Sequence, residues 1–288
     1  NGIRLEDKLG ANPFKYGMIG STDNHVSMTT TREENYFGKL PNEEPSPNRA
    51  TQPFLKDKKT GETIVSTWQL GASGLVAVWA RENTREAIFD AMARKEVYAS
   101  SGTRMTVRLF AGWDFQSDEV LRPDFAAQGY ARGVPMGGDL TQAPAGKAPS
   151  FMVRALRDPD GANLDRIQII KGWLDGRETQ ERVYDVTCSD GRGIVNRRCE
   201  REVGSTVNVA DASYTNSIGD VMLMAHWTDP DFDAQERAFY YVRVIEIPTP
   251  RWTAYEAKRF GVTMPDTVPM ITQERAYTSP IWYTPEAP

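Results

Sequence analysis

The stretch that decides the fold runs FMVRALRDPDGANLDRIQIIKGW, from Phe151 to Trp173. It holds two β-rich apolar runs, 151–156 and 167–173, on either side of the turn signal Asp158-Pro159-Asp160-Gly161. Short apolar runs bounded by turn residues are typical of antiparallel strands. The same texture returns in three further segments: 103–110, 221–227 and 239–247. We therefore predict an antiparallel β-sandwich-like domain over residues 133–288, entered through the Gly- and Pro-rich junction at 133–149.

The first third of the chain has α/β character instead. Residues 16–20 form a short apolar run that ends in glycine, and residues 74–80 form a second one, so both are predicted to be buried strands. Asn83 and Glu86 have the spacing of a capping box, which predicts a helix to about residue 94. Strand, loop and helix in this order are half of a βαβ unit. Residues 29–62 are polar and rich in proline, so we expect a surface excursion that lies over a site.

The composition excludes two classes of protein. The 288 residues carry a net charge of -5 without a long basic stripe, so no nucleic-acid partner is expected. No apolar run reaches the roughly 18 residues of a membrane span. The chain starts at Asn1 without an initiator Met or a leader, which we interpret as a processed or truncated product.

Cys188 and Cys199 are the only two cysteines, and they flank the turn-like stretch 189–193. They are either free thiols or a disulfide that staples a hairpin. We favour the disulfide because an even pair at hairpin spacing is what such a staple shows. A disulfide requires an oxidising compartment, so the protein is expected to be periplasmic or secreted.

Asp23 and His25 lie two residues apart in a polar loop that leaves the first predicted strand. A carboxylate and an imidazole at this spacing can face one metal ion, and hard oxygen with borderline nitrogen suits Zn, Mn or Fe. Reactive groups on loops after strand ends are typical of α/β barrels. The bland alternative is a capped loop with a satisfied histidine. The other histidine, His226, lies in an apolar β pattern and is interpreted as a strand residue.

The turn Tyr98-Ala99-Ser100-Ser101-Gly102-Thr103-Arg104 is the second candidate. Its hydroxyls and the fork of Arg104 could bind an oxyanion, which makes Arg104 the candidate catalytic contact. The alternative is a helix-to-strand turn with a surface arginine.

Gly20-Ser21-Thr22-Asp23-Asn24-His25 resembles the late Gly-Ser-Asp-x-His type motif of the polymerase and histidinol phosphatase (PHP) superfamily. Further segments resemble a large bacterial family of uncharacterised PHP-like proteins: 12–17, 78–87, 98–104, 132–138 and 279–283. The resemblance implies that residues 1–132 are the C-terminal part of a distorted (β/α) barrel. It also implies that Asp23 and His25 are ligands in a centre of two or three divalent ions.

The chain departs from this family in one respect that bears on function. It lacks the early Asp-Leu-His-x-His type motif and has two histidines in total. We therefore expect a missing N-terminal segment or a cleaved partner chain, pairing with 16–20 and 75–80, to complete the site. The expected parent is a metal-dependent hydrolase of small phosphate or related esters, inactive in this chain alone. The alternatives are a non-catalytic binding module and an enzyme relative whose metal site is lost.

Overall fold

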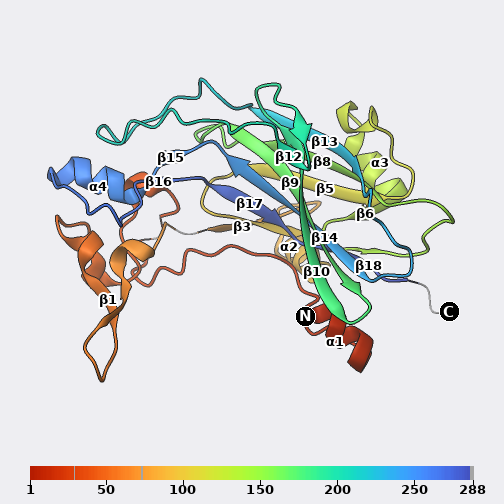
Figure 1. The fold of residues 1–288 in the computed structure, drawn as a ribbon, viewed down its shortest axis with the longest axis horizontal. Coiled ribbons are helices and arrows are strands. Elements are labelled where there is room, and N and C mark those ends of the chain that lie inside the picture. Colours follow the sequence, from red (N-terminus) through yellow and green to blue (C-terminus); the bar gives the residue numbers. More distant parts are fainter. Residues whose placement is uncertain (29, 73, 286–288) are drawn as a thin grey trace.

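Two facing β-sheets form the bulk of the structure (Figure 1), a computed structural model that describes residues 1–28, 30–72 and 74–285. The larger sheet has the order β10 (Glu178–Cys188), β9 (Leu164–Asp175), β14 (Ala238–Glu246), β17 (Arg275–Thr278), β4 (Val97–Ser100) and β3 (Leu75–Val78). In the same sheet, β18 (Ile281–Tyr283) pairs with β14 and with β7 (Asp139–Leu140). The smaller sheet has the order β13 (Met222–Thr228), β8 (Ser150–Leu156), β5 (Thr106–Gly112) and β6 (Gly133–Pro135). The strands predicted from 103 onward are thus confirmed, and those within these sheets pair antiparallel except for β18 with β7.

Side chains that alternate along the strands build the core between the sheets. Val107, Leu109 and Ala111 of β5 are buried in this core, together with residues of β8, β9, β13 and β14. Phe110 points to the other face, where it packs on α3 (Phe125–Arg132) through Phe125. Successive side chains of a strand point to opposite faces, so β5 serves both clusters. Each fully buried Val, Leu or Phe side chain of this kind contributes about 1.5–3 kcal/mol.

The remaining helices are short. They are α1 (Gly2–Leu9), α2 (Arg85–Ala93) and α4 (Trp252–Phe260). The predicted helix after Asn83 is confirmed as α2, but Thr84 is its N-cap and accepts a hydrogen bond from the Ala87 amide. Among the described residues, no helix is both long and apolar enough to cross a bilayer.

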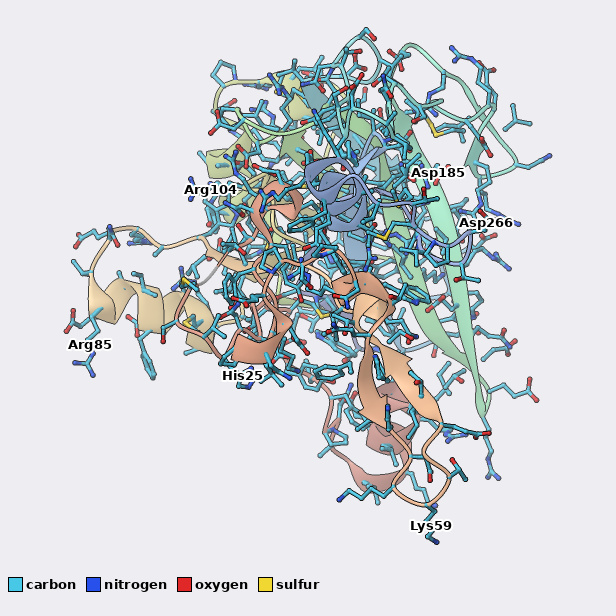
Figure 2. The ribbon with its side chains drawn as sticks, turned by 90° about the vertical axis from the view of Figure 1, so that its left-hand side faces the viewer. His25, Lys59, Arg85, Arg104, Asp185 and Asp266 are labelled. Carbon is cyan, nitrogen blue, oxygen red and sulfur yellow. A yellow bond between two sulfur atoms is a disulfide. The ribbon has the colours of Figure 1, made fainter. Side chains whose placement is uncertain are left out.

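The proline-rich excursion has more local structure than its sequence indicates. It contains the single-turn helices η1 (Glu33–Asn35), η2 (Pro41–Glu43) and η3 (Arg49–Thr51) and the strand β1 (Pro53–Lys56). β1 forms a hairpin with β2 (Thr63–Ser66), which follows the excursion and leads into η4 (Thr67–Gln69). The hairpin projects away from the sheets, with Lys59 near its tip (Figures 1 and 2). A third apolar cluster fixes the excursion to α4, with Tyr36, Ala50 and Trp252 at its centre.

The barrel expected over residues 1–132 is not seen, since the described residues form no closed barrel. Residues 16–20 run extended without strand pairing, and Tyr16 and Ile19 are 58% and 60% exposed. β3 and β4 do lie on either side of α2, but they pair antiparallel with each other. Periodicity identifies a strand but not its direction, which here follows from the pairing of β4 with β17. The boundary predicted at residue 133 does not interrupt the sheets, because β4 pairs with β17 and β5 with β8.

The disulfide prediction is confirmed. Cys188 and Cys199 are bonded, with their Cα atoms 6.0 Å apart. The bridge closes a loop that holds the small hairpin of β11 (Ile194–Val195) and β12 (Arg198–Cys199). The buried Asp185 carboxylate accepts hydrogen bonds from the Cys199 amide and the Gln168 side chain, which fixes the loop against the sheet. A last two-stranded ladder joins β15 (Thr249–Pro250) to β16 (Ile271–Thr272).

Candidate functional site

The loop of residues 21–25 is fixed at its start by the close approach of two glycines to the sheet. A Cβ at Gly20 would lie 2.5 Å from the Leu75 carbonyl oxygen, and one at Gly74 would meet the Ser100 carbonyl. The Gly74 amide donates to the Ser21 carbonyl at 3.0 Å. Only glycine allows a backbone to pass this close, which places the loop beside the first residue of β3.

Further along, the excursion holds the same loop. The Asn24 side-chain amide donates to the Gly38 carbonyl at 2.6 Å, and the His25 amide donates to the Lys39 carbonyl at 2.9 Å. Asp23 has a φ of 49°, in the left-handed region that Asp tolerates better than most residues. The backbone around the two predicted ligands is therefore fixed from both sides.

Asp23 and His25 are both exposed, and each presents its side chain to solvent. The Lys39 ammonium contacts the Asp23 carboxylate at 2.5 Å. This hydrogen bond is the main reason that the pKa of Asp23 is lowered, and the charges of Lys39 and His25 lower it further. Asp23 is thus an ionised oxygen donor with an imidazole nearby, and a lysine stands where a cation would bind.

Two donors are too few to hold a metal ion tightly. His226 is engaged elsewhere: its Nε2 lies 2.8 Å from the Phe115 carbonyl oxygen, in the smaller sheet. In the part of the chain that the structure describes, only Asp185, Cys188 and Cys199 bring three ligand atoms together. The two sulfurs are bonded to each other, so this group is not a metal site.

Arg104 lies apart from the Asp23–His25 loop, as Figure 2 shows for Arg104 and His25. Its guanidinium is exposed, and its backbone amide donates to the Asp158 carboxylate at 2.8 Å. The two serine hydroxyls of the same turn are occupied, because Ser100 donates to the Thr103 carbonyl and Ser101 donates to Glu274. The predicted oxyanion contact and the predicted metal ligands are therefore not brought together by this chain.

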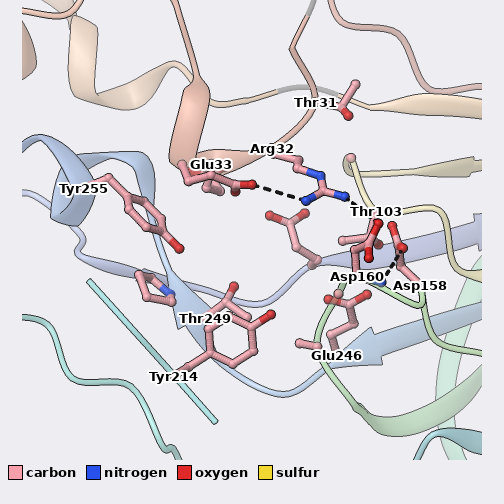
Figure 3. A pocket seen from close by; sticks show the side chains of 16 residues that line it. Thr31, Arg32, Glu33, Thr103, Asp158, Asp160, Tyr214, Glu246, Thr249 and Tyr255 are labelled. Atoms are coloured by element: carbon pink, nitrogen blue, oxygen red, sulfur yellow. Dashed lines mark hydrogen bonds and ion pairs between the residues drawn. The ribbon is translucent and has the colours of Figure 1, made fainter. Parts of the chain in front are cut away.

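Next to Arg104 lies a cavity of about 250 Å³ that the sequence did not indicate (Figure 3). Its lining carries six carboxylates and one guanidinium, that of Arg32, which pairs with Glu34 and Asp160. Glu246 is fully buried, and Glu274 is 8% exposed. The Glu33 carboxylate accepts a hydrogen bond from the Trp252 amide, at the first residue of α4. We call this space the acidic cavity.

Burial is the first cause of abnormal acidity in the acidic cavity. It raises the pKa of Glu246 to about 8 and that of Glu33 to about 7, and the charge of Glu274 raises both further. Burial also raises the pKa of Glu274. Several carboxylates that share one cavity repel one another and resist ionisation. A positive ligand in the cavity would favour the ionised forms of Glu246 and Glu33.

Residues 1–285 match the model of a family described as a protein of unknown function (DUF3604). The chain belongs to the DUF3604 family. No curated protein and no solved structure matches it. The match covers nearly the whole length, so both the Asp23–His25 loop and the acidic cavity belong to the DUF3604 region.

Sequence reasoning missed the acidic cavity of this DUF3604 chain because its residues come from distant segments. Glu33 belongs to the excursion, Asp158 to the β8–β9 turn, and Glu246 ends β14. One signal was present in the sequence, because Glu246 directly follows the apolar run of β14. A charged residue is rare in a protein core unless it has a partner.

Proposed function

We propose that Asp23 and His25 are one arm of a hydrolytic metal centre that acts on phosphate or related esters. The observation that carries this proposal is the pair itself: an ionised carboxylate and an imidazole, both exposed, on a loop fixed at the sheet and at the excursion. The resemblance of residues 20–25 to the PHP motif supports the same role. The donor set suits Zn, Mn or Fe, two or three ions in the complete centre.

A bound metal in such a centre would supply an activated water and polarise the ester. The contribution of this chain is narrower. Asp23 offers one oxygen and His25 one nitrogen, and Lys39 has to leave the carboxylate before another cation can take its place. Arg104 is exposed and forms no ion pair among the described residues. It would contact the oxyanion of a substrate that reaches from the Asp23–His25 loop to Arg104.

The other ligands are proposed to come from outside residues 1–288, either from a further segment of the gene product or from a partner chain. The open edge of the larger sheet supports this. β3 pairs with β4 alone among the described strands, and Val76 in β3 is 41% exposed. Exposed apolar side chains lie on neighbouring elements, with Phe89 of α2 at 69% exposure. A strand edge beside apolar surface is a template for pairing with another segment.

A titration of Mn²⁺ against the chain, with free Mn²⁺ counted by electron paramagnetic resonance, tests the arm directly. We expect weak binding that Asp23→Asn or His25→Gln weakens by about 10-fold or more. The matched control is Asp266→Asn, an exposed acid on another loop (Figure 2), which should leave binding unchanged. If both ligand variants bind Mn²⁺ as strongly as the native chain does, the proposal is rejected. Tight binding of two ions by this chain, together with phosphoester hydrolysis, would instead reject the need for a partner.

A second candidate is a non-catalytic binding module or a relative whose metal site is lost. The pairing of Asp23 with Lys39 favours it, because the ammonium already neutralises the one ionised ligand. A full-length gene product that contains no metal would favour this second candidate over the hydrolase.

We also propose a periplasmic or extracellular location, which the Cys188–Cys199 disulfide supports. Alkylation of the native protein under non-reducing conditions should then label neither cysteine. Two labelled thiols in freshly isolated protein would contradict this location.

A further inference from the structure

Several distant parts of the fold line the acidic cavity. Glu33 and Arg32 come from the excursion, Thr103 from the β4–β5 turn, and Glu246 from the end of β14. Two tyrosines, Tyr214 and Tyr255, add their rings to the lining, as Figure 3 shows. With a volume of about 250 Å³, the cavity lies below the roughly 300–1,000 Å³ of drug-sized sites, so its ligand would be small.

Glu246 is the feature that points to a ligand. Its side chain points into the cavity from β14 (Figure 3), and the residue has 0% exposure. Neither carboxylate oxygen has a hydrogen-bond partner of ordinary geometry. The Thr103 hydroxyl and the Ala162 amide are close enough to lower the pKa of Glu246, but neither makes a hydrogen bond of ordinary geometry with its carboxylate. A buried carboxylate that lacks well-placed donors is unfavourable, so this position is explained best by a group that donates to it.

The missing group is a cation that carries N–H donors. An anion would meet five carboxylates in excess over the one guanidinium of the lining. A bare metal ion fits poorly, since no three carboxylates of this lining bring their oxygens within 4.8 Å of one another among the described residues. A quaternary ammonium offers charge but no donor for the Glu246 oxygens. A primary ammonium offers both, with three N–H groups.

The separation of the carboxylates indicates more than one positive group. Glu33 and Glu246 lie on different sides of the cavity (Figure 3). A tyrosine ring face can also attract an ammonium by a cation–π interaction. We propose that the acidic cavity binds a small aliphatic diamine, with one ammonium donating to Glu246 and the other facing Glu33. This site is separate from Asp23 and His25 and does not depend on the hydrolase proposal.

Isothermal titration of the chain with 1,4-diaminobutane at low ionic strength tests the site. We expect one ligand per chain and a loss of affinity of about 10-fold or more in Glu246→Gln, which keeps the shape and removes the charge. The matched control Glu178→Gln changes an exposed glutamate on β10 and should bind as the native chain does. 1,4-Butanediol and tetramethylammonium should each bind about 10-fold or more weakly, since one lacks charge and the other lacks donors.

Several results would overturn the proposal. They are an absence of binding heat with the diamine, equal affinity in Glu246→Gln, and Ca²⁺ binding more tightly than the diamine with the same Glu246 dependence. Circular dichroism verifies that each variant is folded. If Glu246→Gln does not fold, Glu33→Gln carries the test, because Glu33 is the carboxylate that faces the second ammonium. Undiminished binding in that variant then counts against the site.

Discussion

Replacing Arg49 with methionine should release the excursion that supports both candidate sites. Arg49 is 1% exposed, and its guanidinium donates to the backbone carbonyls of Tyr36, Phe37 and Glu43. It also forms an ion pair with Glu256 of α4. The carbonyls of the next two residues after Phe37, 38 and 39, hold Asn24 and His25. One buried cation therefore connects α4 to the Asp23–His25 loop.

The size of the effect follows from what the substitution leaves behind. Methionine fills much of the space and keeps apolar contact with Trp252, whose ring lies 4.5 Å from the guanidinium carbon. It leaves three carbonyls without donors and the buried Glu256 without its counter-charge. Removing one partner of a buried ion pair costs about 3–5 kcal/mol. Glu256 can take up a proton, because burial already raises its pKa, so we expect the lower end of this range.

Urea unfolding and amide hydrogen exchange measure the two sides of this prediction. We expect a loss of about 3 kcal/mol in the free energy of unfolding. Faster exchange should be confined to residues 31–72, because the sheets have their own core. Arg85→Met, at the exposed start of α2, is the control and should change stability by less than about 0.5 kcal/mol. A loss below about 1 kcal/mol with unchanged exchange over 31–72 would refute the role given to Arg49.

Three further predictions concern single contacts. Lys39→Met should raise the pKa of Asp23 in a carbon-detected NMR titration and strengthen Mn²⁺ binding, because the competing ammonium is gone; an unchanged pKa contradicts this. The free energy of unfolding should fall as the pH rises from about 4.5 to 8, since folded Glu246 keeps a proton that the unfolded chain loses. Glu246 should contribute at most about 1.4 kcal/mol per pH unit to the slope of the unfolding free energy against pH, and Glu246→Gln should reduce this slope. An equal slope in the variant argues against a buried, protonated Glu246. Replacing Cys188 and Cys199 by serines should lower the free energy of unfolding by about 3 kcal/mol in thermal unfolding, because it opens a loop with a sequence separation of 11. An unchanged unfolding midpoint would show that the disulfide does not stabilise the fold.

Local patterns predicted the β-rich part of the fold well. The alternation in 103–110 and 151–156 became β5 and β8, and the turn at 158–161 separates β8 from β9. These patterns depend on neighbouring residues alone, so they can be recognised without knowledge of the rest of the chain. The cysteine spacing worked for the same reason, because the bridge closes a local hairpin.

The arrangement of the first third could not be predicted in this way. Residues 16–20 read as a strand, but their amides find other partners: the Met18 amide donates to the Ser279 hydroxyl, 261 residues away. The excursion reads as structureless, yet Arg49 and Trp252 order it through contacts between distant segments. Pairing over such separations is set by the whole chain and leaves no local periodicity.

The two candidate sites differ in the same way as the two parts of the fold. Asp23 and His25 are close in sequence, so their spacing could suggest that both bind one metal ion. Glu33 and Glu246 come to line the same cavity only after folding, so no motif in the sequence could reveal the acidic cavity. Arg104 was predicted to bind an anion, but the cavity beside its turn carries six carboxylates and one guanidinium.

The role of Asp23 and His25 is tested most directly by the metal content of the full-length gene product after exhaustive dialysis, measured by plasma mass spectrometry beside its His25→Gln variant. We expect two or three equivalents of Zn, Mn or Fe in the native protein and a loss of at least one equivalent in the variant. Equal metal content in the two proteins, or no metal in either after loading with these ions, would contradict the role of Asp23 and His25 as ligands.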